Sequence, residues 1–240
     1  MSAIDAMTAK SITGDYVTKG NALHFLFNGK TIKGYQFTRQ ELTNLFENDL
    51  NNEIFMMLAL SGAEPNKYLN VVLAKMHDNE MNLGTMIVSS NDPYTDNVIY
   101  NAQEIAIKSS GRMMNKGALL EEGQPIPIEE LVRIQDAYNN ATDYHITCTN
   151  TDRIKCYRID RQDLFDLKLN DTVTAANKND IFMFMPVIRP KRANDPIPLT
   201  KDYLSLAVAR FDPLTRKVVG AIIEYCLPCP SACAINYWHR

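Results

Sequence analysis

The sequence repeats itself at a spacing of about half its length. Residues 32–42 read IKGYQFTRQEL and residues 154–164 read IKCYRIDRQDL, with Ile, Lys, Tyr, Arg, Gln and Leu identical at a spacing of 122 residues. Four blocks that recur in the same order are hard to obtain by chance, so we interpret the chain as a tandem duplication. The three downstream blocks begin at Asn52 and Asn179, at Tyr68 and Tyr203, and at Gly84 and Gly220.

The duplication divides the chain into two predicted repeats. The first covers residues 1–122 and ends in a closing helix and a linker, and the second covers residues 123–240 and ends in a Cys-rich tail. A composition of 45% hydrophobic and 22% charged residues is ordinary for a globular protein. A chain of 240 residues can form one large domain or two domains of about 120 residues each.

A short helix is predicted near the start of each repeated block. Thr38 to Glu41 fits a capping box, in which the threonine hydroxyl and the glutamate carboxylate each accept a backbone N–H. Asp160 to Asp163 keeps the N-cap acceptor with a shorter second acid. Apolar spacing and Pro punctuation favour further helices. These are expected at residues 3–19, 96–114 and 127–140.

Three strands are predicted after each helix, joined by links rich in turn residues. Three consecutive strands with short links form an antiparallel meander. Because both faces of these strands are rich in apolar residues, we expect helices to cover one face. The predicted fold class is therefore α+β, with helices packed on an antiparallel sheet in each repeat, the two sheets being separate or merged. The strands are expected at residues 54–60, 68–76, 83–89, 181–188, 203–211 and 218–225.

Charge and hydropathy exclude several classes of protein. The net charge of −3 argues against a nucleic-acid binder, which usually has a basic patch. The strongest apolar run, Ile54 to Leu60, is far shorter than the roughly 20 residues of a membrane-spanning helix. The N-terminus shows neither the basic region nor the apolar region of a secretory signal. We therefore expect a cytoplasmic protein with no membrane span.

All five cysteines lie in the second repeat, and three of them cluster near its end. Cys226, Cys229 and Cys233 have C-x2-C-x3-C spacing, and the first two could reach one tetrahedral zinc ion from a tight turn. A structural zinc site normally pairs two such knuckles, and here there is one. The C-x-x-C pair also allows thiol redox chemistry, although a thioredoxin-type site begins a helix in a βαβ unit. The third reading is a Pro-rigidified tail with buried or free thiols. We expect no cofactor, with zinc as the alternative.

The run from Tyr203 to Cys233 resembles a set of uncharacterised small bacterial proteins. Their pattern is a short helix, a strand meander and a C-terminal C-P-x-x-C element followed by Asn. The resemblance covers residues 154–236 and implies this fold without implying an activity. The first repeat departs from it, with Ser90, Pro93 and Asn97 at the cysteine positions. The matching residues are Asp212, Gly220, Cys229, Pro230, Cys233 and Asn236.

Two other pairs of residues recur between the repeats. His24 and His145 take nearly equivalent places in the two repeats. They could act as metal ligands or bases, or they could be polar residues at a strand end. Arg39 and Arg161 both lie in the first turn of a predicted helix, where a cation is unfavourable for the helix dipole. Each would bind an anionic group or, as we expect, pair with a carboxylate in its own repeat.

The link between the second repeat's first two strands is longer than its counterpart in the first repeat. It contains Arg189, Lys191 and Arg192 together with several prolines, so we expect a stiff, exposed loop that either contacts a partner or is simply a solvated tip.

No P-loop, dinucleotide-binding, nucleophile-elbow, zincin or EF-hand motif is present in the sequence. The sequence therefore favours a non-enzymatic protein that binds a protein partner or assembles with itself, for example through strand edges. The alternatives are a metalloprotein with zinc at the C-terminal cysteines and a thiol redox protein.

Overall fold

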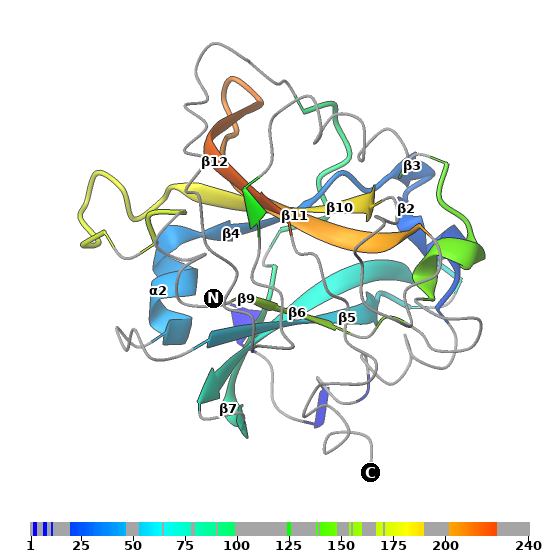
Figure 1. Ribbon diagram of the computed structural model, residues 1–240, viewed down its shortest axis with the longest axis horizontal. Helices are drawn as coiled ribbons and strands as arrows, with labels where there is room; N and C mark the ends of the chain where they lie inside the picture. Colours follow the sequence, from blue (N-terminus) through cyan, green and yellow to red (C-terminus); the bar gives the residue numbers. More distant parts are fainter. Residues whose placement is uncertain are drawn as a thin grey trace, which may run out of the picture.

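The chain folds into two five-stranded antiparallel sheets that lie face to face (Figure 1). The structure, a computed structural model, describes residues 2–3, 7–8, 11, 20–46, 53–63, 65–77, 80–89, 91–98, 124–125, 138, 140–147, 154, 156–159, 167–169, 171–189 and 202–224. The helical elements are η1 (Ala22–Phe25), α2 (Arg39–Phe46) and η2 (Asp143–Ile146), of which η1 and η2 are single 3₁₀ turns. The strands are β1 (Ser2–Ala3), β2 (Leu26–Phe27), β3 (Lys30–Thr31), β4 (Tyr35–Thr38), β5 (Glu53–Ser61), β6 (Tyr68–His77), β7 (Glu80–Val88), β8 (Gln124–Pro125), β9 (Cys156–Ile159), β10 (Ile181–Arg189), β11 (Tyr203–Asp212) and β12 (Lys217–Glu224).

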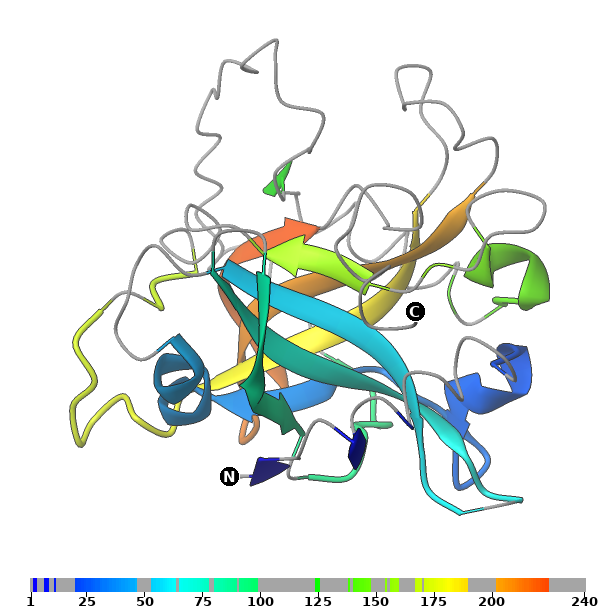
Figure 2. The same cartoon turned by 90° about the horizontal axis from the view of Figure 1, so that it is seen from below.

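The two large sheets have matching strand orders. The first sheet runs β1-β7-β6-β5-β9 and the second runs β8-β12-β11-β10-β4, so elements at the same place in each half of the chain take the same place in each sheet. β2 and β3 form a separate two-stranded sheet at the end of the molecule opposite α2 (Figures 1 and 2). The two expected meanders, β5-β6-β7 and β10-β11-β12, are confirmed, and their bounds agree with the sequence to within about three residues.

Each sheet takes one strand from the other half of the chain. β4, from the first half, pairs antiparallel with β10, so that Tyr35 lies opposite Phe184. β9, from the second half, pairs in the same way with β5, so that Tyr157 lies opposite Met56. β4 and β9 therefore each pair with a strand from the other half of the chain, an arrangement that we call strand exchange. The repeat boundary at residue 122 lies outside the described residues and stays a prediction.

The predicted α+β fold class is wrong, because the described residues are mostly β-structure. They contain one α-helix, α2, and the sheets do not pack against layers of helices. The apolar faces predicted to need helical cover are covered by the opposite sheet, as in a β-sandwich. The predicted helix at Thr38 forms and is capped as expected, since Glu41 accepts from the Thr38 backbone N–H at 2.7 Å. Its counterpart after Asp160 and most residues of the other expected helices lie outside the described part.

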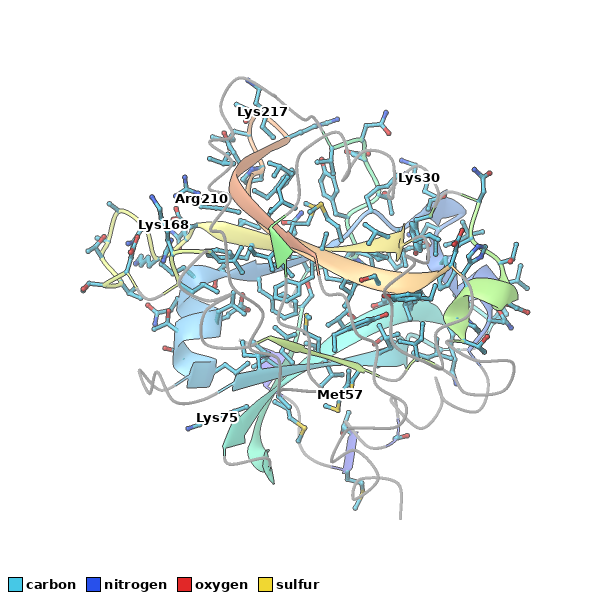
Figure 3. All side chains as sticks on the ribbon, viewed as in Figure 1. Lys30, Met57, Lys75, Lys168, Arg210 and Lys217 are labelled. Carbon is cyan, nitrogen blue, oxygen red and sulfur yellow. The ribbon has the colours of Figure 1, made fainter. Side chains whose placement is uncertain are left out.

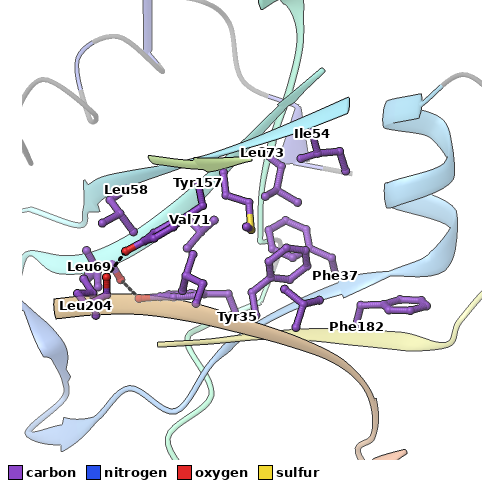
Figure 4. Packing of buried hydrophobic residues seen from close by; sticks show 14 of the residues in the cluster. Tyr35, Phe37, Ile54, Leu58, Leu69, Val71, Leu73, Tyr157, Phe182 and Leu204 are labelled. Carbon is purple, nitrogen blue, oxygen red and sulfur yellow. Dashed lines mark hydrogen bonds between the residues drawn. The ribbon is translucent and has the colours of Figure 1, made fainter. Parts of the chain in front are cut away.

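The main hydrophobic core fills the space between the two large sheets (Figure 4). Alternate residues of each strand point inward, as a pleated sheet requires. Two buried tyrosines on the exchanged strands cross this space. Tyr35 of β4 donates its hydroxyl hydrogen bond to the Leu69 carbonyl at 2.6 Å, and Tyr157 of β9 donates to the Leu204 carbonyl. Each hydroxyl therefore links an edge strand of one sheet to an inner strand of the other.

The outer face of the second sheet is buried as well. Residues 91–98 cross it, and Tyr94 packs edge-on against Phe211 with ring centroids 5.2 Å apart. The same segment pairs with the start of β4, because Tyr94 N–H donates to the Gly34 carbonyl at 2.8 Å. Gly34 has no room for a side chain, since a Cβ there would lie 2.5 Å from the Met183 side chain. The methionines of β5 and β10 are buried, as expected of core-filling residues.

Candidate functional site

The cysteine cluster lies outside the described residues. This applies to Cys226, Cys229 and Cys233, so the zinc site stays a prediction. Cys156 is described, and its side chain is buried in β9. Among the described residues, no group of three or more His, Cys, Asp or Glu side chains is arranged to hold a metal ion.

The predicted partner-binding loop starts at the end of the sandwich opposite α2. Arg189 is the last residue of β10, which points away from α2 (Figure 1), and only its backbone is described. Lys191 and Arg192 lie outside the described residues. The loop therefore leaves the sheet at the same end as β2 and β3, and its role in binding stays a prediction.

Two 3₁₀ turns take equivalent places in the two halves, η1 against β6 and η2 against β11. In η1, the backbone N–H of Asn21 donates to Nδ1 of His24 at 3.1 Å. In η2, the backbone N–H of Thr142 donates to Nδ1 of His145 at 3.0 Å. The structure thus places both histidines, which the sequence suggested as ligands or bases, at separate turns as acceptors for their own N-cap residues.

An exposed apolar pair lies on η1 and the residue that follows it. Leu23 is 77% exposed and Leu26 is 41% exposed. Leu26 is the C-cap of η1 and is extended, with φ −107° and ψ 141°, so the two leucines lie on either side of the end of the turn. Phe25, between them, is buried in the core and holds the turn against the sandwich. We call Leu23 and Leu26 the leucine pair.

The β2–β3 hairpin begins at Leu26, and an aromatic contact holds it against the sandwich. Phe27 lies opposite Lys30 in the hairpin, and its ring packs edge-on against Tyr68 with centroids 4.9 Å apart. Burial raises the pKa of Tyr68, and the nearby Asp92 carboxylate acts in the same direction. Since successive residues of a strand face opposite sides, Phe27 faces the sandwich and Leu26 faces away.

Arg39 is buried at the opposite end, where it joins the two halves. Its side chain is 1% exposed, and Nη2 lies 3.1 Å from Oδ2 of Asp180 while Nη1 donates to the Lys168 carbonyl. Its guanidinium also lies 5.3 Å from the centre of the Phe182 ring. The expectation that Arg39 pairs with a carboxylate of its own repeat is wrong, because Asp180 belongs to the other half. Arg161 lies outside the described residues.

The Asp180 carboxylate lies near a second cation as well as Arg39. Nη1 of Arg210 lies 3.7 Å from the same Oδ2 that bonds Arg39. Arg210 and Lys168 lie on the side of the molecule that carries α2, far from Lys30 (Figure 3). These contacts give Arg39 a structural partner in Asp180.

Asp96 links the β2–β3 hairpin to the turn between β11 and β12. Its carboxylate lies 4.0 Å from Lys30 Nζ and 3.5 Å from a guanidinium nitrogen of Arg216. Burial raises the pKa of the neighbouring Tyr94, with Arg216 opposing and Asp96 adding to the shift. All three charged side chains are largely exposed, so these ion pairs contribute little to stability.

A third exposed leucine lies at the tip of the β11–β12 turn. Asp212 fixes this turn by accepting from the Thr215 hydroxyl at 2.6 Å and from the Leu214 backbone N–H at 3.0 Å. These hydrogen bonds, that of the Thr215 hydroxyl first, lower the pKa of Asp212. Leu214 itself is 94% exposed. In contrast to the leucine pair, it stands alone at its tip, where single exposed apolar residues are normal.

Sequence reasoning missed the leucine pair. The run from Ala22 to Phe27 reads ALHFLF, which looks like a short buried strand. The available signal was the cap, since Asn21 precedes His24 by three residues just as Thr142 precedes His145. A cap at that place predicts a turn in place of a strand.

No helix in the described part of the chain is long and apolar enough to cross a membrane. No known protein family, curated protein or solved structure matches this sequence or its fold.

Proposed function

We propose that this protein is a non-enzymatic β-sandwich that binds a protein partner or assembles with itself. The observation that carries the proposal is the leucine pair, Leu23 and Leu26, two exposed apolar side chains three residues apart at a capped turn. A partner that buried Leu23 would gain roughly 2 kcal/mol from that side chain alone. Exposed apolar groups that are fixed in place are typical of contact surfaces, because little conformational entropy is lost on binding.

The rigidity of this surface supports the proposal. Asn21 and His24 close the start of η1, Phe25 is anchored in the core, and Phe27 packs on Tyr68 just beyond. The leucine pair is therefore held from both sides. β10 ends with Arg189 at the same end of the sandwich, where the predicted partner-binding loop begins.

The test compares Leu23→Asp with Leu214→Asp. Both substitutions put a carboxylate on an exposed leucine, so neither should change the stability of the fold by more than about 0.5 kcal/mol. Sedimentation velocity over a wide concentration range measures self-association. Affinity purification with each variant as bait, quantified by mass spectrometry, measures partner binding.

We expect Leu23→Asp to weaken self-association, or to lose a partner that wild type and Leu214→Asp both retain. A chain that stays strictly monomeric at high concentration, with no protein that distinguishes the Leu23→Asp bait from the other two, would contradict the proposal. Loss of the same partner by both variants would show that the contact does not depend on the leucine pair.

A further inference from the structure

The tip of the β2–β3 hairpin carries the one Asn-Gly pair in the sequence, Asn28 and Gly29. Phe27 lies directly opposite Lys30, so Asn28 and Gly29 form a two-residue turn. Their φ angles are 51° and 77°, both in the left-handed region, as a type I′ hairpin turn requires. Both residues are exposed.

We propose that Asn28 is a site of spontaneous deamidation, which converts the hairpin tip into a mixture of aspartate and isoaspartate. The backbone nitrogen of Gly29 loses its proton to hydroxide and attacks Cγ of Asn28, forming a new C–N bond. The side-chain nitrogen takes a proton from water and leaves as ammonia, which restores the hydroxide, and a succinimide ring remains. Water then adds to one of the two ring carbonyls and breaks one C–N bond. No electrons are transferred, and water is the only co-reactant.

The local structure favours attack at this asparagine. A side chain on the following residue shields the attacking nitrogen, and Gly29 has none. A Cβ placed on Gly29 would meet no atom within 4 Å, so the space around this peptide is open. Asn66 and Asn140 are also exposed, but Lys67 and Ala141 follow them.

Opening of the hairpin sets the pace of the reaction. Ring closure requires rotation about the backbone bonds of Asn28, which the closed turn fixes. The hairpin has two residues in each strand, and a two-stranded hairpin is marginally stable by itself. The contact between Phe27 and Tyr68 holds it closed. The rate at Asn28 therefore reports how often this contact opens.

The products change the hairpin in two ways. Each adds a carboxylate two residues from Lys30, which lies beside Asp96. Isoaspartate also lengthens the main chain by one carbon, so Phe27 and Lys30 can no longer face each other across a two-residue turn. Leu26 lies on the same hairpin, and the modification goes beyond the proposed function because it needs no partner.

The experiment incubates the purified full-length protein in mildly alkaline buffer and follows every asparagine by peptide mapping and mass spectrometry. We expect Asn28 to convert measurably faster than Asn66 and Asn140, with isoaspartate among the products. Equal rates at the three sites would overturn the proposal. Asn28→Gln should abolish the early mass change and so identify its origin.

The role of hairpin opening is tested with Phe27→Ala and a matched control, Leu214→Ala. Phe27→Ala removes the contact with Tyr68, whereas Leu214→Ala shortens an exposed side chain at another turn. We expect the first variant to deamidate several-fold faster than wild type and the second to match wild type. Tyr68→Leu removes the same contact from the other side and should behave like Phe27→Ala. Identical rates in all of these proteins would show that opening is not the gate.

Discussion

Single polar side chains tie the two sheets together at fixed points. Tyr35 and Tyr157 are fully buried, and each hydroxyl donates across the sandwich to a carbonyl of the opposite sheet. The spacing of 122 residues in the sequence predicts that these two tyrosines are equivalent. It does not predict which groups accept their hydrogen bonds. A buried tyrosine needs a partner, but no local pattern says that the partner is a carbonyl on the other sheet.

Tyr35→Phe and Tyr157→Phe should each lower the free energy of unfolding by about 1–2 kcal/mol, since a buried carbonyl loses its donor. Urea denaturation measures the difference. Tyr94→Phe is the matched control, because the buried Tyr94 hydroxyl has no hydrogen-bond partner in the described part of the structure. It should be neutral or slightly stabilising. A Tyr35→Phe variant as stable as wild type would refute the structural role of this bond.

Arg39 shows the same limit of sequence reasoning. Its unfavourable position at a helix start predicted a carboxylate partner, and Asp180 is that partner. Sequence alone assigned the partner to the wrong half of the chain, because strand exchange is a long-range event. Asp180→Ala leaves a buried guanidinium without its counter-ion, so it should cost about 2–4 kcal/mol.

The matched control for this pair is Arg216→Met, which breaks the exposed ion pair with Asp96 and should cost less than about 1 kcal/mol. Thermal or urea unfolding of both variants provides the comparison. Equal losses would mean that Asp180 contributes no more than a surface charge.

At the scale of elements, sequence patterns identified what is long or locally capped. The six long strands and the capped start of α2 were predicted close to their observed bounds. β4 and β9 were missed because they have four residues each and precede a predicted helix. The alternation of Tyr35 and Phe37, both inward, with Gln36 and Thr38 was the available signal for β4.

The 3₁₀ caps were also missed, because the residue that closes each box is histidine where glutamate or glutamine is usual. His24→Ala should speed hydrogen exchange at the Asn21 amide and cost about 1 kcal/mol. His24→Gln keeps an acceptor on a side chain of similar reach and should restore most of the protection. NMR-detected exchange reports both effects, and unchanged protection in His24→Ala would rule out the cap.

At the scale of the whole molecule, the predicted α+β architecture failed for a specific reason. Strands that are apolar on both faces were taken to need helices, but each sheet covers the inner face of the other. Segment 91–98 then covers part of an outer face without being helical. Local patterns show that a face is buried and do not show which element buries it.

Strand exchange makes the two halves dependent on each other. A fragment of residues 1–122 would lack β10 and β9, which pair with its strands β4 and β5. A fragment of residues 123–240 would lack β4 and β5, the partners of its strands β10 and β9. We expect neither half to form a folded monomer, because the inner face of its sheet would be exposed to water. Mixing equimolar halves should restore the structure, as followed by circular dichroism and light scattering. A half that unfolds cooperatively as a monomer would contradict this expectation.

The pairing of β4 with β10 also constrains the order of events during synthesis. Tyr35 leaves the ribosome early, yet its strand partner Phe184 follows nearly 150 residues later. Until then, β4 has an open edge and no sheet to join. Contacts between such distant residues slow folding. A ribosome that pauses before β10 would therefore prolong the interval in which this apolar strand is most exposed to aggregation.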